Sequence, residues 1–559
     1  MRKNKILPLI LSVAVLGTCL AGCGSKEETT TTSSSSSSDE MDKSPITLTM
    51  FTKDSSEDIL FDDDVAKKIT ELTGVTLKIT HPVAGDEQAI PLMIASGEYP
   101  DLIYAKGDTG KLVDAGALVQ LDDYIEKEGD NLKELYGDQI KRLRYSADDQ
   151  SIYTVGTYRV NSEVKNPDGA LQIQHAVLKD QGYPTIKTLE DYEKAIKAYK
   201  EKYPEINGQK TIGLSLMASD WRWLITCGNR AGMVAGIPDD GQWKVDDETG
   251  EAIYKFELPE CKEYFKWLCH MNAEGLLDPE SFTQKEDTYK AKISQGIVLG
   301  LSDAYWDYDA SKKTLQGANM DERTYAPLSV TLNDECKDQA MKDYGFSGGF
   351  GVGITTSCEN KERAFQFLNW LASDEAQILI NWGIEGKHYE VVDGKRQFLP
   401  EVQQKLNTDK DYKKTSGVGK YIYPFPERGE LDRDANGDTY NTDTLQNYID
   451  NYNSAEKETL AAYGKKSWTE MFPSADELGV SKHGGVWQYN VPSDSDVAII
   501  QKKADDYTQK AITQAILGSE DDFDAAWDKI QDDLQAMDIK KADEGMTKIV
   551  KDTMKLWND

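Results

Sequence analysis

The spacing of apolar residues in the first part of the chain switches between strand and helix periods. Alternation in Ile46–Phe51 predicts a strand, and Val65, Ile69 and Leu72 form one face of a predicted helix. The elements expected here are a strand over 46–51, a helix over 62–73, a strand over 75–79, a helix over 87–96, a strand over 101–104 and a helical turn over 107–116. Strands alternating with helices predict an α/β unit with a largely parallel sheet.

The same alternation returns further along the chain. Thr188 and Asp191 form a predicted capping box at the start of a helix. The later elements expected are a helix over 188–199, a strand over 211–216, a hairpin over 242–258, a helix over 260–274, strands over 297–301 and 350–355, a helix over 359–372, and mostly helix over 497–559 with interruptions at Gly518 and Gly545. This pattern predicts a second α/β unit.

The chain begins with a basic segment and an apolar run of secretory type. Arg2, Lys3 and Lys5 precede Ile6–Leu20, which is too short to span a membrane comfortably. The run ends in Leu20–Cys23, a Leu-Ala-Gly-Cys string that resembles a bacterial lipobox. That resemblance implies cleavage after residue 22 and acylation of Cys23; a plain signal peptide with a chance cysteine is the alternative.

A polar tether follows the expected lipid anchor. Residues 23–45 include unbroken threonine and serine runs at 29–32 and 33–38, which have nothing to bury and predict a flexible spacer. We therefore expect a body held at the extracellular face of the cytoplasmic membrane by lipid on Cys23, not by a spanning helix.

Charge and reactive residues exclude several functions. The 559 residues carry a formal net charge of −33, so nucleic acid is not an expected partner. Beyond Cys23 only five cysteines remain, an odd number, and none forms a Cys-x-x-Cys pair. The five histidines are scattered, and the sequence has no Gly-x-Ser-x-Gly, Walker or His-Glu-x-x-His motif. We therefore expect that the protein is not an enzyme and that it binds no catalytic cofactor.

Four phrases, in order along the chain, resemble those of extracellular solute-binding proteins of ABC importers. They are Met93–Ile103, Asp114–Leu121, Gly349–Leu371 and Trp382–Tyr389, the last similar to the large Gram-positive lipoprotein branch. The resemblance covers nearly the whole mature chain. It includes sugar and oligosaccharide receptors, the alginate-binding type among them.

The resemblance implies a two-lobed α/β periplasmic-binding-protein fold with a hinge and a ligand cleft between the lobes. Residues 46–157 and 326–395 are expected in lobe 1, and residues 158–325 and 396–559 in lobe 2. The implied function is capture of a carbohydrate by a monomer and its delivery to ABC permease subunits. A receptor for a peptide or another small solute is the alternative within the fold, and a surface-tethered glycan hydrolase is the alternative from another class.

Acidic residues that follow predicted strands are the first candidates for binding. Asp54 follows the first strand and Asp108 the third, and in sugar-binding relatives acids at matching places bond sugar hydroxyls. An ionised carboxylate accepts strong hydrogen bonds, which suits a polyol. The alternative is that both acids cap the helices that follow.

Aromatic loops supply the other candidates. The phrase at 303–306 resembles the family's aromatic loop that stacks on sugar rings, and aromatic faces bury the apolar face of a sugar. Because tryptophans two positions apart in 221–223 alternate in and out, one of them is core in the alternative interpretation. The ligand-binding candidates are Trp221, Arg222, Trp223, Asp303, Tyr305, Trp306 and, from a proline-bounded loop, Tyr423.

The loop Asp432–Asp443 matches a calcium motif. Acid or amide falls at loop positions 1, 3 and 5, glycine at 6 and an acid at 12, as in EF-hand loops. Asp443 is one carbon shorter than the usual glutamate, and Thr439 replaces the usual aliphatic residue. A structural Ca²⁺ is predicted, and a solvated acidic turn is the alternative. The predicted ligands are Asp432, Asp434, Asn436, Asp438 through its carbonyl, and Asp443.

Lipidation can be tested directly. We expect Cys23→Ala to leave the protein without lipid, because acylation requires the thiol of the lipobox cysteine. Mass spectrometry of the membrane fraction measures this. An unmodified Cys23 in the membrane-bound wild type would contradict the prediction.

Overall fold

The computed structural model describes residues 41–54, 59–82 and 88–558. The predictions for the leader, for Cys23 and for the Ser/Thr runs lie outside these residues. All elements named below belong to one unit, residues 42–559.

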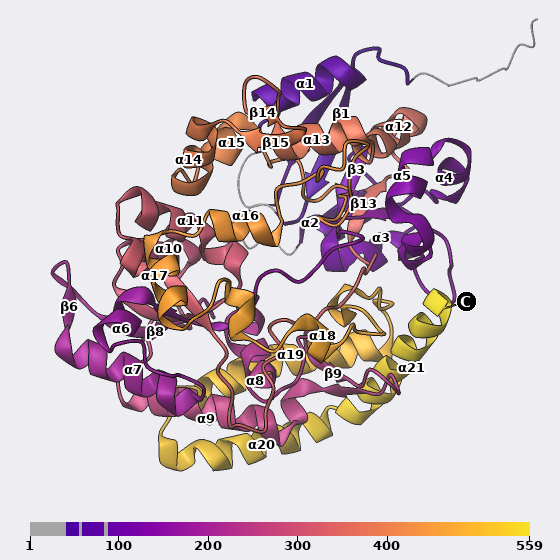
Figure 1. Ribbon diagram of the computed structural model, residues 1–559. Helices are drawn as coiled ribbons and strands as arrows, with labels where there is room; N and C mark the ends of the chain where they lie inside the picture. Colours follow the sequence, from indigo (N-terminus) through magenta and orange to yellow (C-terminus); the bar gives the residue numbers. More distant parts are fainter. Residues whose placement is uncertain (1–40, 55–58, 83–87, 559) are drawn as a thin grey trace, which may run out of the picture. The chain divides into compact units, whose positions relative to one another are not determined.

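A five-stranded sheet carries the first group of elements (Figure 1). Its order is β2 (Val75–Thr80), β1 (Ile46–Thr52), β3 (Leu102–Tyr104), β13 (Gly351–Ile354) and β4 (Thr154–Gly156). β1 pairs in parallel with β2 and β3, while β13 runs antiparallel to β3 and β4. The expected α/β unit is confirmed, but the sheet is mixed because the chain returns to it in the opposite direction.

A four-stranded sheet carries the second group. Its order is β12 (Tyr325–Leu328), β5 (Leu171–Gln174), β11 (Val298–Ser302) and β8 (Ile212–Ser215). Only the β8–β11 pair is parallel, and β5 is antiparallel to both of its neighbours. Two-stranded ladders form from β6 (Glu205–Ile206) and β7 (Gln209–Lys210), β9 (Trp243–Val245) and β10 (Ala252–Tyr254), and β14 (Tyr389–Val392) and β15 (Lys395–Phe398).

Helices surround both sheets. Those near the first sheet in sequence are α1 (Asp64–Thr73), α2 (Ala89–Ser96), α3 (Thr109–Asp114), α4 (Asp122–Glu128), α5 (Asp130–Tyr136), α12 (Lys361–Leu371) and α13 (Asp374–Trp382). Those near the second are α6 (His175–Asp180), α7 (Leu189–Lys202), α8 (Asn229–Met233), α9 (Pro259–Ala273), α10 (Glu286–Ser294) and α11 (Tyr305–Gly317). Later helices are α14 (Pro400–Thr408), α15 (Tyr412–Ser416), α16 (Leu445–Asp450), α17 (Ser454–Ala462) and α18 (Ala475–Leu478).

Helix ends follow the capping chemistry of the sequence. At α7 both bonds of the predicted capping box between Thr188 and Asp191 are present. Asp63 caps α1 by accepting from the backbone N–H of Ala66 at 2.9 Å, and Gly74 ends it with φ 74°. Only glycine adopts this left-handed conformation freely, so the predicted end of α1 has a physical cause.

The C-terminal region is helical, but one of its breaks differs from the prediction. It consists of α19 (Asp496–Ile516), α20 (Phe523–Ala536) and α21 (Ile539–Asn558), the yellow end of Figure 1. Gly518 follows α19 as expected, whereas Gly545 lies inside α21. A Cβ on Gly545 would lie 2.3 Å from Val497 Cγ2, so this glycine allows α21 to pack closely on α19. The second break instead falls before α21, where Asp538 has φ 61°.

The five cysteines after Cys23 serve as small side chains that pack in the interior of the protein. Cys227, Cys261, Cys269 and Cys358 are buried and Cys336 is partly buried, all as free thiols. None of the helices within the described residues combines the length and the apolar character that a membrane span requires.

Gly300 provides a test of how closely β11 packs against Tyr192 of α7. A Cβ there would lie 2.2 Å from the hydroxyl of Tyr192, which is buried and donates to the carbonyl of Gln172 at 2.7 Å. We expect Gly300→Ala to lower the free energy of unfolding by about 1–3 kcal/mol, as overpacked cores do. Denaturant unfolding measures it. Gly107→Ala is the control, since a Cβ at Gly107 meets nothing within 4 Å; equal losses in both variants would contradict the packing account.

Candidate functional site

The carboxyl ends of β1 and β3 present a cluster of alternating charge. Because these strands are parallel neighbours, the residues that follow them lie at the same edge of the sheet. Lys106 Nζ donates to Asp54 Oδ1 at 2.8 Å, and Lys53 bonds Asp108. Lys111 Nζ also lies 2.7 Å from Asp108 Oδ1. Burial raises the pKa of Asp108, but the bonds and charges of Lys111 and Lys53 outweigh burial and hold that pKa below its usual value.

Two tryptophans present a stacked aromatic surface at the ends of the second sheet's parallel pair. Trp221 follows β8, and Trp306 follows β11 at the start of α11. Their rings are 6.0 Å apart between centroids and only 12° from parallel. The exposed fractions of Trp221 and Trp306 are 49% and 54%, which is high for such large apolar residues. Exposed stacked indoles provide a flat face for a ligand.

Lys106 joins the acidic and the aromatic groups. Its Nζ, bonded to Asp54, also lies 5.0 Å from the centroid of the Trp221 ring. Asp54 Oδ2 accepts from the hydroxyl of Tyr423 at 2.7 Å, and Tyr423 is 44% exposed. Asp54, Lys106, Trp221, Trp306 and Tyr423 therefore form one group, here named the Lys106 cluster.

Arg222 also contacts the aromatic pair. Its guanidinium carbon lies 5.0 Å from the Trp221 centroid. Its nitrogens contact three carboxylates, those of Asp220 at 2.8 Å, Glu286 at 2.6 Å and Asp307 at 3.2 Å. Because Asp307 is the residue after Trp306, this ion-pair group links the two tryptophan loops.

Three of the predicted binding residues lie elsewhere. Trp223 is only 4% exposed and packs in the core between Phe256 and Phe265. Asp303 is fully buried and accepts from the hydroxyl of Tyr289 at 2.8 Å. Burial, together with the charge of Asp307, raises the pKa of Asp303 well above its usual value. Tyr305 turns away from the Lys106 cluster into a separate pocket.

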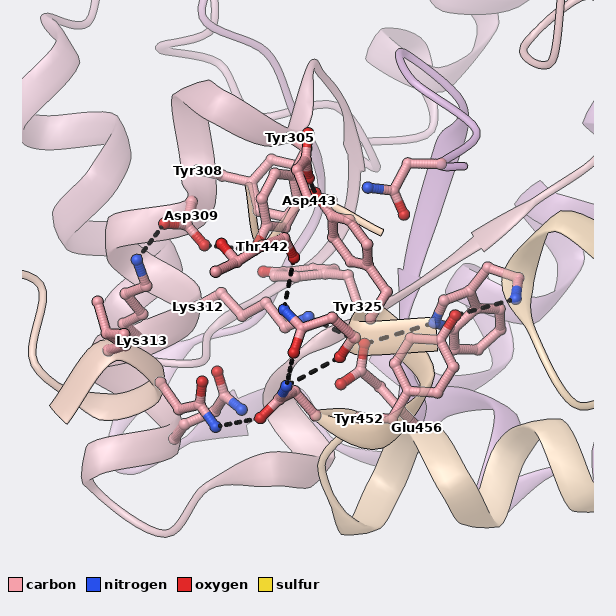
Figure 2. A pocket seen from close by; sticks show the side chains of 18 of the residues that line it. Tyr305, Tyr308, Asp309, Lys312, Lys313, Tyr325, Thr442, Asp443, Tyr452 and Glu456 are labelled. Carbon is pink, nitrogen blue, oxygen red and sulfur yellow. Dashed lines mark hydrogen bonds and ion pairs between the residues drawn. The ribbon is translucent and has the colours of Figure 1, made fainter. Parts of the chain in front are cut away.

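That pocket, about 260 Å³ in volume, is shown in Figure 2. Tyr305, Tyr308, Tyr325 and Tyr452 are among its walls, and none of the Lys106 cluster lines it. Four of its charged groups form two pairs, Lys312 Nζ with Glu456 at 2.9 Å and Lys313 Nζ with Asp309 at 2.7 Å. Gln172 contributes a buried Oε1 that has no hydrogen-bond partner among the residues that the structure describes.

The sequence did not point to two further residues beside the Lys106 cluster. Trp487, 37% exposed, contacts Tyr344 with ring centroids 4.9 Å apart, and Tyr158 hydrogen-bonds to Trp487. Burial and the nearby Asp54 raise the pKa of Tyr158 to about 12, against the effect of that bond. Tyr158 follows β4, a strand that the apolar pattern did not reveal. Trp487 lies in a loop without a motif.

The five predicted calcium ligands in Asp432–Asp443 do not converge. Arg396 Nη2 bonds Asp434 Oδ2 at 2.8 Å, and the backbone N–H of Arg396 donates to Asp438 Oδ2 at 2.8 Å. Asp432 instead accepts from Asn161 at 2.8 Å, and the backbone N–H of Asn436 donates to Asp434 at 2.8 Å. Two acidic groups of this loop, those of Asp434 and Asp438, therefore face Arg396.

Asp443 lies in another ion-pair group. It contacts Arg159, Lys165 at 3.2 Å and the hydroxyl of Tyr448 at 2.6 Å. Burial raises the pKa of Asp443, but Arg159 and Lys165 outweigh burial and hold that pKa well below its usual value. Within 41–54, 59–82 and 88–558, no group of three or more His, Cys, Asp or Glu is arranged to hold a metal ion. The loop in this arrangement does not fit Ca²⁺.

The role of Arg396 can be tested by unfolding. We expect a chelator to leave the melting temperature unchanged, since a guanidinium neutralises the loop. Arg396→Met should lower the free energy of unfolding by about 3 kcal/mol, because it removes the positive charge that neutralises the carboxylates of Asp434 and Asp438. Lys395→Met is the control: Lys395 is exposed, donates to the carbonyl of Gly437 at 2.6 Å, and approaches Asp438 Oδ1 only to 3.7 Å. A melting temperature raised by calcium would show that the loop rearranges to bind the ion.

Comparison with known proteins places this arrangement in a family. Residues 64–382, more than half of the chain, match the model of the bacterial extracellular solute-binding protein family. The chain is 26% identical over 340 residues to lipoprotein LipO of Bacillus subtilis strain 168, covering 59% of this chain and 64% of LipO. It is 25% identical over 361 residues to the fructooligosaccharide ABC transporter substrate-binding protein FusA of Streptococcus pneumoniae serotype 4, covering 62% of this chain and 63% of FusA. The chain thus spans less than two thirds of either relative.

Solved structures show the same fold. The alginate-binding protein AlgQ2, determined without calcium ion, is 16% identical, with a TM-score of 0.64 over 91% of this chain and 98% of that chain. An EF-hand mutant of S. pneumoniae FusA in complex with fructo-nystose is 18% identical, with a TM-score of 0.66 over 90% of this chain and 99% of that chain. The chain therefore belongs to the bacterial extracellular solute-binding protein family and has its mixed α/β, periplasmic-binding-protein-like fold.

Proposed function

We propose that this chain is the substrate-binding lipoprotein of an ABC importer. In this proposal it captures a carbohydrate, specifically an oligosaccharide, between two α/β lobes and delivers it to permease subunits. The observation that carries the proposal is the exposed Trp221–Trp306 stack beside Asp54 and Tyr423. The relatives support it, because FusA is named for fructooligosaccharide and AlgQ2 for alginate.

The site has the chemistry that a sugar requires. An indole face buries the apolar face of a pyranose, while carboxylate oxygens accept from its hydroxyls. In the proposal Trp306 stacks on a ring, and Asp54 or Asp108 bonds hydroxyls from the other lobe. A ligand that contacts both lobes favours their closure, which a permease can recognise.

The proposed lobes follow the two sheets. Lobe 1 still ends at residue 157, where the chain passes into lobe 2. The return of the chain to lobe 1, expected between residues 325 and 326, comes after Leu328 instead, because β12 pairs with β5 of the second sheet. Part of 396–559 also joins lobe 1, since Lys420 Nζ lies 2.9 Å from Asp63 Oδ2 at the start of α1. The connections between the sheets would then act as the hinge.

The proposal places the protein outside the cytoplasmic membrane. The family is extracellular, LipO is named a lipoprotein, and the lipobox-like string supports a lipid anchor on Cys23. The acidic body, tethered through 23–45, works as a monomer and has no nucleic-acid partner. Calcium is left out of the proposal, because the predicted ligands contact Arg396, Arg159 and Lys165.

Two alternatives compete with a sugar receptor. A peptide or another small solute could occupy the same fold, since fold does not determine the ligand. A glycan hydrolase would require two carboxylates across the scissile bond. Asp54 and Asp108 are instead each held by lysines, an arrangement that favours binding over acid–base chemistry.

A thermal-shift screen of the mature protein against a glycan library tests the proposal. A glycan at 100 times its dissociation constant should stabilise the protein by about 2.7 kcal/mol. Stabilisation by peptides with no response to any glycan would overturn the carbohydrate assignment.

The Trp306 face should supply much of the binding energy. We expect Trp306→Ala to weaken glycan binding by about 1–3 kcal/mol, by analogy with the loss of aromatic stacking in other complexes. The stability of the ligand-free protein should hardly change, since Trp306 is 54% exposed. Calorimetric titration and thermal melting measure the two effects.

Trp223→Ala is the matched control, since Trp223 lies in the same loop as Trp221 but is buried in the core. It should melt far lower, because large-to-small core changes cost about 3–5 kcal/mol. A Trp306→Ala protein that melts much lower and yet binds glycan normally would place Trp306 in the core and the site elsewhere.

A further inference from the structure

We infer that the Lys106 cluster selects uncharged oligosaccharides and disfavours chains of uronic acids. This inference rests on the proposed function and deepens it. Family membership leaves the question open, because alginate, for which AlgQ2 is named, carries a carboxylate on every sugar, whereas a fructooligosaccharide carries none. The charged side chains around the site favour the uncharged class over the uronic-acid class.

Each cation placed at the site already holds a carboxylate of this chain. Lys106 bonds Asp54 at 2.8 Å, and Lys53 and Lys111 share Asp108. Arg222 contacts three carboxylates within 3.2 Å, so its positive charge is already balanced by this chain. A uronate carboxylate entering here would find no free positive partner among these groups.

Recruiting one of these cations would carry a cost. If a uronate took Lys106, Asp54 would lose its ion pair and keep only the hydroxyl of Tyr423, 2.7 Å away. An unpaired carboxylate would then lie beside the ligand's own carboxylate, and like charges brought together at an interface weaken binding. A neutral sugar avoids this cost, because its hydroxyls donate to Asp54 without displacing Lys106.

The surroundings reinforce the selection. The ionic groups beside Trp221 and Trp306 are paired with one another, and the chain as a whole carries a formal charge of −33. The electrostatic field of such a protein repels a polyanion before contact and leaves a neutral chain unaffected.

Matched glycans isolate the charge of the ligand. Mannotetraose and β-1,4-linked tetramannuronate differ mainly at C6, as do cellotetraose and the β-1,4-linked glucuronate tetramer. A trigalacturonate and its carboxyl-reduced form make a third pair. Titration calorimetry of the mature protein with all six, beside an array of neutral and acidic glycans, gives each ratio of dissociation constants. We expect the neutral member of every pair that binds to bind at least tenfold more tightly.

Freeing Lys106 should change that ratio. Asp54→Asn keeps the size of the side chain but removes the charge that occupies Lys106, so the preference for the neutral member should fall at least threefold. Asp180→Asn is the matched control, since it removes the partner of Lys202, which lies 2.7 Å from it in a separate lysine–aspartate pair. That variant should leave the ratio unchanged.

The outcomes divide clearly. An acidic member that binds as tightly as its neutral partner, or more tightly, overturns the charge selection and leaves the glycan receptor intact. A neutral preference that Asp54→Asn does not change, in a variant folded by circular dichroism, overturns the role given to the Asp54–Lys106 pair. Binding of peptides, with no binding to any glycan of the array, overturns the proposed function and this inference with it.

Discussion

The ammonium of Lys106 holds the candidate site together. It donates to Asp54 at the edge of the first sheet and lies 5.0 Å from the Trp221 ring, which belongs to the second group of elements. Lys106 has φ 52°, a left-handed conformation that costs a non-glycine residue of the order of 1 kcal/mol or more. Strain of this kind persists where surrounding contacts fix the residue, and here those contacts are the two halves of the site. Acid, cation and indole therefore act as one group.

Neighbouring residues at the start of α11 face different surroundings. Successive residues of a helix point about 100° apart, so Trp306 can stack on Trp221 while Tyr305 lines the pocket of Figure 2. The two places differ in chemistry. The pocket contains paired charges, such as Lys313 with Asp309, whereas the Lys106 cluster presents exposed aromatic faces. This difference favours Trp306 as the surface on which the proposed sugar stacks.

Much of the site could be predicted because strand ends are easy to recognise. Asp54, Asp108, Trp221 and Trp306 follow strands whose apolar runs were clear in the sequence. The same rule did not apply to Tyr158, which follows the short strand β4, or to Trp487, which lies in a loop. Periodicity also cannot tell an exposed tryptophan from a buried one, as Trp221 and Trp223 show; tertiary packing alone separates them. In the fold, the expected parallel sheets proved mixed for a similar reason, since strand direction depends on how the chain returns.

The calcium motif shows the limit of local spacing. The oxygens fall at the right positions of the loop, but Arg396 reaches Asp434 and Asp438 from β15, and Arg159 reaches Asp443 from beyond β4. A motif confined to Asp432–Asp443 carries no information about such partners. A crystal structure of the mature protein with the tightest-binding glycan is the most direct test of the whole account. It should show a sugar ring stacked on Trp306 with a hydroxyl bonded to Asp54; a glycan seated in the Tyr305 pocket instead, with the Trp306 face empty, would contradict it.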